Sequence, residues 1–363
     1  MFDDLKYYFT VGDKKYYSDM DALRNSNGAE VNFQLNYNFI KNGNWKKRPT
    51  ESIYDLFDTH TKIIYEKYEQ IILMYSGGTD SHTILESFIR CGIRDVIIYE
   101  SSFVEQKQVK ERWNITQDML KSLSRYKQTF KDLNYKVLSA GAGEDFSVQD
   151  VPNRGITKVI DETMPQKLID ISHHGSYHRL TNNANDKLRI NTKRKTAVVW
   201  GFSKPSLRIF NNQWHWYTTS SDFLIGKVLT TEDYDDVYFF ITDEVPNLHI
   251  KLTWLKIEVI ESILKTSYRN DMSLSDRVVM LQINQSPFYE NINESMGYRA
   301  LNKFLNGTSY KPGGKAMKLI RPKLLANIPT EVKILGRELT HGIKNEDLTT
   351  VSKPIPIKAF DNA

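Results

Sequence analysis

The chain has 363 residues, 40% of them hydrophobic and 26% charged, a composition typical of a globular protein long enough to bury a large core. The net charge of +5, from 49 Lys+Arg and 44 Asp+Glu, permits an anionic partner and does not require one. The only cysteine, Cys91, excludes an intrachain disulfide and a zinc cluster built from cysteines. With no signal-peptide pattern and no apolar run long enough to span a bilayer, we expect a cytoplasmic protein without a membrane partner.

Residues 1–50 are expected to form a small β region. Aromatic and apolar residues alternate with polar ones in KYYFTVG, KKYYS and EVNFQLNYNFI, and Gly, Asp and Asn turn signals separate these runs. A polar connector, KNGNWKKRP, follows, and from Ile53 the apolar residues take helical spacing.

Residues 51–265 show strands that alternate with helices. Strands are predicted at 71–75, 95–100, 195–202 and 236–242, and helices at 82–92, ending at Gly92, at 109–126 and at 252–265. This rhythm favours an α/β fold, with a mostly parallel sheet sandwiched by helices. Residues 266–363 are expected to be an accessory region, with an extended tail at KPIPIKAF.

The string most informative about function is IILMYSGGTDSHTIL, in which an apolar strand runs into a polar loop and a helix begins at once. The loop consists of Ser76, Gly77, Gly78, Thr79, Asp80 and Ser81. Its glycines allow close approach to a phosphate, and its hydroxyls and the first N–H groups of a helix are anion donors. Bare phosphate would repel Asp80, so we expect Asp80 to meet a metal ion carried by that phosphate. The competing interpretation is an ordinary Gly-Gly turn with capping residues.

SGGTDS after an apolar strand resembles the SGGxDS signature of the PP-loop ATP pyrophosphatases, a superfamily similar to asparagine synthetase, NAD and GMP synthetases, tRNA thiolases and phosphoadenylyl-sulfate reductases. Over about residues 50–260, the resemblance implies the adenine nucleotide alpha-hydrolase-like (HUP) fold. It also implies that ATP is split between its α and β phosphates with Mg²⁺ bound at Asp80. The small β N-terminus and tryptophan connector resemble SGGxDS proteins of bacteriophages, described as asparagine-synthase-like or sulfate-reductase-like.

Two further segments fit the same resemblance. DVIIYESSF is similar to the strand whose end helps to hold the adenosine, which implies Tyr99, Glu100 and Ser101 beside the nucleotide. VVWGFSKPSLRIF resembles a later strand whose following loop presents a lysine to the phosphates, which implies Lys204, with Arg208 as a second cation. Cations there would stabilise the charge that builds on departing pyrophosphate. The competing interpretations are a solvated Lys204 and a surface ion pair at Arg208.

The single cysteine narrows the chemistry that the resemblance implies. The sulfate reductases need a C-terminal nucleophilic cysteine, the thiolases usually need several, and class II asparagine synthetases begin with Met-Cys where this chain has Met-Phe. We therefore expect an enzyme that adenylates a carbonyl or carboxylate oxygen for attack by ammonia or an amine. The alternatives are modification of a base in RNA or DNA, and a nucleotide-binding module without turnover.

For several other residues and segments, a structural role is a simpler interpretation than a functional one. Cys91 is expected to be a buried small hydrophobe, and Trp214 and Trp216 are expected in core or edge packing rather than over the mouth of a site. The basic segments at 45–49, 191–195 and 310–323 could line a groove for nucleic acid but are more typical of solvated surface. The segment ISHHGSYHRL contains His173, His174 and His178, which we expect to be polar loop residues. The alternative is that one of them acts as a base or that they bind a metal ion.

Overall fold

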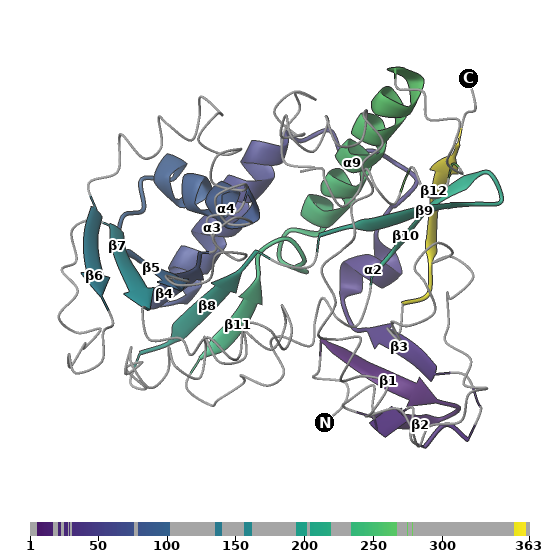
Figure 1. Ribbon diagram of the computed structural model, residues 1–363, viewed down its shortest axis with the longest axis horizontal. Helices are drawn as coiled ribbons and strands as arrows, with labels where there is room; N and C mark the ends of the chain where they lie inside the picture. The colour runs from purple at the N-terminus through teal and green to yellow at the C-terminus, as the bar shows by residue number, and fades with distance from the viewer. Residues whose placement is uncertain are drawn as a thin grey trace, which may run out of the picture. The chain divides into compact units, whose positions relative to one another are not determined.

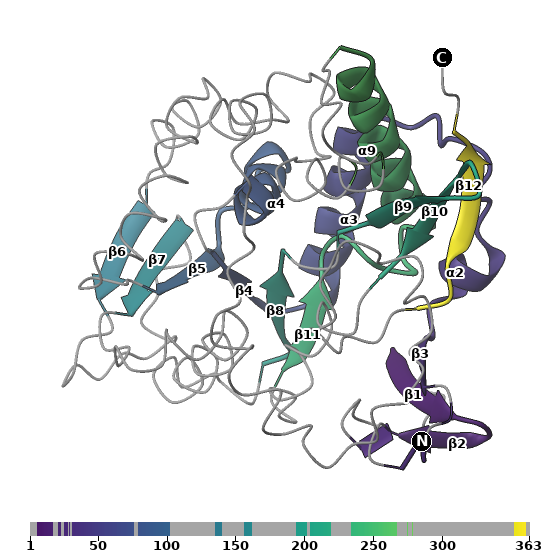
Figure 2. The same ribbon diagram turned by 45° about the vertical axis from the view of Figure 1, so that its right-hand side comes forward.

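The computed structural model (Figures 1 and 2) describes residues 6–16, 21–22, 25–27, 29, 31–75, 79–101, 135–139, 156–161, 194–201, 204–218, 234–266, 274, 278 and 352–360. The chain divides into two compact units. Unit 1 comprises Met1–Thr50, Ser203–Leu224 and Ile241–Ala363, and unit 2 comprises Glu51–Phe202 and Ile225–Phe240. Residues 203–224 and 241–363 group with the N-terminal segment in unit 1.

A parallel sheet of six strands forms the centre of unit 2, in the order β11-β8-β4-β5-β7-β6. Every pair of neighbours in it is parallel, as the alternation of strands and helices predicted. The strands are β4 (Gln70–Met74), β5 (Val96–Ser101), β6 (Tyr135–Ser139), β7 (Ile156–Asp161), β8 (Thr196–Trp200) and β11 (Asp235–Tyr238). β4 and β8 are buried at every position, because their sequences QIILM and TAVVW suit strands covered on both faces.

β4 lies at the point where the chain stops adding strands on one side of the sheet and starts adding them on the other. β5 lies on one side of β4 and follows it in the sequence, whereas β8, on the other side, comes from much later in the chain. Ligands of open parallel sheets bind beyond the carboxyl ends of the strands at such a switch point. The segment that follows β4 is therefore where this fold favours a binding site.

Two helices of unit 2, α3 (Ile53–Lys67) and α4 (Thr79–Arg90), lie side by side in both views (Figures 1 and 2). The backbone N–H of Asp55 donates to the Ser52 hydroxyl at 3.1 Å, which caps the start of α3. Gly92, predicted at the end of the second helix, has a φ of +73°, the left-handed conformation that ends helices. The helix expected at 109–126 lies outside the described residues.

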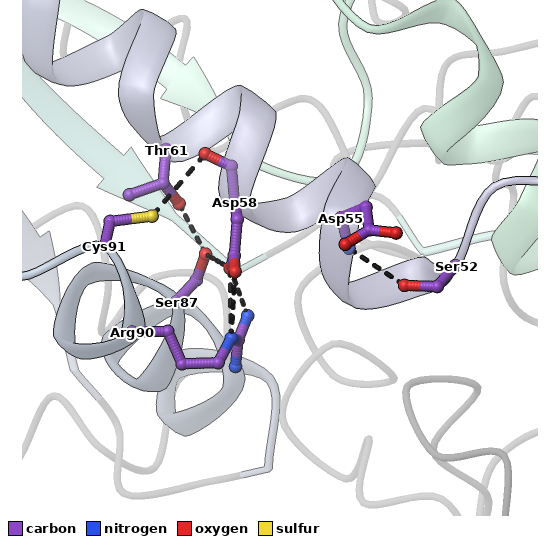
Figure 3. A network of polar contacts seen from close by, with 7 residues as sticks. All are labelled: Ser52, Asp55, Asp58, Thr61, Ser87, Arg90 and Cys91. Atoms are coloured by element: carbon purple, nitrogen blue, oxygen red, sulfur yellow. Dashed lines mark hydrogen bonds and ion pairs between the residues drawn. The ribbon is translucent and has the colours of Figure 1, made fainter.

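Polar side chains join α3 to α4 (Figure 3). Arg90 Nε donates to both carboxylate oxygens of Asp58, at 3.0 and 3.2 Å. The Ser87 hydroxyl donates to Asp58 at 3.0 Å and lies 2.6 Å from the hydroxyl of Thr61. These contacts hold the C-terminal half of α4 on the neighbouring helix α3.

Unit 1 contains two small antiparallel sheets. In the first, β1 (Tyr7–Val11) pairs with β2 (Lys14–Tyr16) and β3 (Val31–Leu35), which confirms the β region predicted near the N-terminus. The end of the third predicted run instead forms a short helix, α2 (Asn38–Asn42). In the second sheet, β9 (Ser206–Phe210) and β10 (Gln213–Tyr217) form a hairpin, and β12 (Ile355–Ala359) pairs with β10.

The long helix α9 (Pro246–Thr266) organises unit 1 through polar contacts as well as apolar ones. Lys251 is buried and donates to the carbonyl of Pro49 at 3.1 Å, and Lys256 is buried and donates to the carbonyl of Pro205 at 2.7 Å. Arg48 makes two contacts with Glu258. The helix thus anchors the connector at 45–49 and the segment that leads into β9.

Candidate functional site

The SGGTDS segment joins β4 to α4 at the switch point of the sheet. β4 ends at Met74, and the N–H of the next residue, Tyr75, donates to the carbonyl of Tyr99 at 2.9 Å, which extends the parallel ladder by one step. α4 begins at Thr79, so Asp80 and Ser81 lie in its first turn. Ser76, Gly77 and Gly78 lie outside the described residues. The strand and the helix predicted on either side of the loop are both present.

The first turn of α4 has the electrostatics of an anion site. The N–H groups of a helix N-terminus lack intrahelical partners and carry the positive end of the helix dipole. Ser81 is buried with 3% of its surface exposed, whereas Asp80 is only partly buried. A carboxylate oxygen such as that of Asp80 suits Mg²⁺, a hard cation. The described residues contain no group of three or more His, Cys, Asp or Glu side chains that could hold a metal ion.

Gly201, directly after β8, approaches this turn closely. A Cβ atom at position 201 would lie 3.3 Å from the Cβ of Asp80 and 3.3 Å from the backbone nitrogen of Ser81. Such separations are tighter than ordinary van der Waals contact, so a glycine lets the end of β8 pass beside the start of α4. Gly201 was not among the predicted site residues. Its signal was a glycine that immediately follows the apolar run TAVVW.

The residues expected beside the nucleotide lie at the end of β5. Met74 and Tyr99 are partners in the register of β4 and β5, so Glu100 and Ser101 extend past the last residue of β4. The side chain of Tyr99 is 1% exposed, which places it in the core rather than on an open surface. The backbone of β5 is therefore adjacent to the start of the SGGTDS segment, and a role of these residues beside a nucleotide stays a prediction.

The two cations expected at the phosphates, Lys204 and Arg208, belong to unit 1, whereas the SGGTDS segment belongs to unit 2. Lys204 precedes Pro205, whose carbonyl is held by Lys256 at 2.7 Å. Arg208 lies on β9 with 2% of its surface exposed, and its guanidinium carbon is 5.8 Å from the ring centroid of Tyr217. Arg208 is therefore not the surface residue that its simplest interpretation assumed.

Of the remaining candidates in the described chain, Trp214 and Trp216 match their structural interpretation, whereas Cys91 is less buried than predicted. Trp214 and Trp216 are buried, at 0% and 1% exposure, which confirms core packing for both. Cys91 is partly buried, and burial and the carboxylate of Asp58 raise the pKa of its thiol, which disfavours the reactive thiolate. The expected loop histidines at 173, 174 and 178 lie outside the described residues, as do the basic segments at 191–193 and 310–323.

Comparison of the chain with known protein families, curated proteins and solved structures finds no match. Within the described residues, no helix is both long enough and apolar enough to cross a membrane.

Proposed function

We propose that this protein is a PP-loop ATP pyrophosphatase with an adenine nucleotide alpha-hydrolase-like (HUP) core in unit 2. The observation that carries the proposal is the placement of the SGGTDS segment. It leaves a fully buried strand at the switch point of a parallel sheet and enters the first turn of α4 with Asp80 and Ser81. This position favours a binding role over a turn with only a capping role, because ligands of open parallel sheets bind beyond the carboxyl ends of strands at a switch point.

In this proposal, each described residue of the segment has a distinct task. The N–H groups of the first turn of α4 bind phosphate oxygens, and Asp80 holds Mg²⁺ together with those oxygens. The absence of a side chain at Gly201 leaves the N–H of Ser81 uncrowded. A role for Lys204 and Arg208 in stabilising the charge on departing pyrophosphate stays a prediction of the resemblance, because both residues belong to the other unit.

The proposed reaction has two steps. A carboxylate or carbonyl oxygen of the substrate attacks the α-phosphorus of ATP, and the bond to the β-phosphate oxygen breaks to release pyrophosphate. Ammonia or an amine then attacks the adenylated carbon, so that AMP leaves and the amine loses a proton. The lone cysteine, with its raised pKa, supports a nitrogen nucleophile over a sulfur carrier on this chain.

Pyrophosphate and AMP release from ATP and Mg²⁺ tests the proposal, with amino acids, ammonia, nucleotides, and bulk tRNA or DNA as candidate substrates. Substrate-dependent pyrophosphate supports it, and the mixture that gives turnover identifies the acceptor class. Turnover only with tRNA or DNA would assign the acceptor to nucleic acid, and binding should then weaken steeply with added salt. Formation of ADP contradicts the proposal, and ATP binding without turnover in any mixture indicates a non-catalytic nucleotide-binding module.

Asp80→Ala is the decisive variant for the site. We expect pyrophosphate release to fall to background while the melting temperature changes little, because Asp80 is only partly buried. Asp95→Ala is the matched control, since Asp95 is an exposed carboxylate of the same unit that is remote in sequence from the segment. Unimpaired turnover in Asp80→Ala would contradict the role of Asp80 in ATP cleavage.

A further inference from the structure

A buried chain of three polar side chains brackets the SGGTDS segment. Tyr75 immediately precedes the segment, and His82 and Glu86 follow it on α4. The Tyr75 hydroxyl oxygen lies 3.0 Å from Nδ1 of His82, and His82 Nε2 lies 3.7 Å from Oε1 of Glu86. Their exposed fractions are 5%, 0% and 7%, so water does not compete for the hydrogen bond between Tyr75 and His82.

The chemistry of the three groups determines which of them donates and which accepts a hydrogen bond. A carboxylate only accepts, so Glu86 favours a hydrogen on the Nε2 atom of His82 that faces it. Nδ1 is then the acceptor, and the Tyr75 hydroxyl donates to it. At 3.7 Å, the contact between His82 and Glu86 is electrostatic rather than a hydrogen bond. The contact that matters for the segment is therefore the one between Tyr75 and His82.

This contact joins the two ends of the segment. The backbone of Tyr75 is already bonded to Tyr99 in the sheet, so its position is set by β5. His82, seven residues further on, belongs to the first turns of α4 next to Ser81. A side-chain bond between them fixes the separation between the end of β4 and the first turns of α4, so the N–H groups of that helix are already placed when a ligand binds.

We propose that Tyr75 and His82 are positioning residues for the polyphosphate of ATP. They hold the first turn of α4 at a fixed separation from the end of β4, so that the N–H groups of that turn converge on the β and γ phosphates. This role rests on the proposed function. It goes beyond the SGGTDS signature, because neither residue belongs to the signature and neither is required by it.

Three variants separate the positioning role from packing. Tyr75→Phe removes only the hydroxyl. His82→Gln places its amide near the position of Nε2 and loses the contact with Tyr75, whereas His82→Asn places its amide near Nδ1 and can keep it. We expect Tyr75→Phe and His82→Gln to weaken binding of ATP–Mg²⁺ and of inorganic pyrophosphate about fivefold to tenfold, the worth of one buried hydrogen bond. His82→Asn should bind nearly as the wild type does, and AMP, which lacks the β and γ phosphates, should bind equally to all.

Ser87→Ala is the matched control. It removes buried hydrogen bonds from the same helix, to Thr61 and Asp58, on the side that faces α3. We expect it to lower the melting temperature without a change in ATP or pyrophosphate affinity. The double variant Tyr75→Phe/His82→Gln should be no weaker than the weaker single variant, because both remove the same contact.

The outcomes distinguish this inference from the proposed function. If the wild-type protein binds neither ATP nor pyrophosphate, the proposed function and the positioning role fail together. If it binds both and Tyr75→Phe binds them equally well, the positioning role alone is overturned. Equal weakening for ATP and AMP would also overturn it, because it would show a general structural defect. Tyr75→Phe keeps the test decisive if His82→Gln does not fold.

Discussion

At the scale of single residues, Asp236 on β11 is a carboxyl group in a largely buried environment. Its Oδ1 accepts a hydrogen bond from Trp200 Nε1 at 2.7 Å, and its Oδ2 is buried with no hydrogen-bond partner among the described residues. Burial raises the pKa of Asp236 to about 7, even though the bond from Trp200 favours the charged form. The neighbouring carboxylate of Asp235 raises that pKa further. Asp236 is therefore largely protonated in mildly acidic solution.

Stability should depend on pH through this group. The pKa of Asp236 is about 7 in the folded protein and near 3.8 in the unfolded chain. Its contribution is therefore complete below pH 3.8 and is lost as the pH rises towards 7, because the unfolded chain releases the proton first. Asp236→Asn keeps a neutral group at this position. Thermal unfolding between pH 4 and pH 8 should show a smaller loss of stability in Asp236→Asn than in the wild type.

The exposed Asp95 provides the control, since Asp95→Asn should follow the wild-type pH profile. Identical pH profiles for the wild type and Asp236→Asn would contradict the assignment of a raised pKa to Asp236.

At the scale of elements, polar contacts join the C-terminal end of α4 to α3. Asp58 accepts from both Arg90 and Ser87, so one carboxylate of α3 holds two side chains of the last turns of α4 (Figure 3). The side chains of Asp58 and Arg90 are only 26% and 30% exposed, so solvent screens this ion pair less than a surface pair.

Asp58→Ala tests that contact. It leaves the partly buried Arg90 guanidinium and the Ser87 hydroxyl without this acceptor, and we expect a loss of about 2 kcal/mol in the free energy of unfolding. Asp55→Ala, at an exposed position in the first turn of the same helix, should cost less, because it removes only a favourable contact with the helix dipole. Urea unfolding of the three proteins measures the difference. Equal losses in both variants would show that the network contributes nothing beyond helix propensity.

At the scale of the whole molecule, unit 1 is assembled from segments far apart in the sequence. β12, near the C-terminus, pairs with β10, and Lys358 of β12 lies 2.9 Å from Glu261 of α9. Phe360 packs edge-on against Trp214, with ring centroids 5.8 Å apart. Glu261 also accepts from Trp214 Nε1 at 2.8 Å, so the tail, the hairpin and α9 share one set of contacts.

Removal of residues 354–363 should therefore destabilise unit 1. It leaves β9 and β10 as a two-stranded hairpin and opens a space beside Trp214, where Phe360 packed. We expect a loss of at least about 3 kcal/mol, comparable to truncation of a buried aromatic side chain. Removal of residues 361–363 alone is the control and should leave the melting temperature unchanged. An unchanged melting temperature after the longer truncation would contradict the role assigned to β12.

Much of the fold could be predicted because local patterns were strong. The buried strands at 70–74 and 196–200, the helix after Ser52 and the helix end at Gly92 follow from apolar runs, apolar spacing and a glycine in a left-handed conformation. β7 was missed, since ITKVID alternates too briefly to stand out. The hairpin of β9 and β10 was missed as well, although Asn211 and Asn212, with φ of 49° and 57°, are residues that favour such a turn.

The sequence by itself determined the local features: which segments are strands or helices, and that a polar, glycine-containing segment joins a buried strand to a helix. These follow from interactions between near neighbours in the chain. Only the tertiary structure decided that this segment lies at the switch point of the sheet, that Gly201 passes beside Asp80, and that Tyr75 bonds to His82 across it. It also decided that α9 and β12 belong with the N-terminal segment. The physical reason is that the pattern of one segment predicts that it has an apolar face or a polar group to bury. Which residues contact that face or group depends on packing and hydrogen bonding among segments distant in sequence.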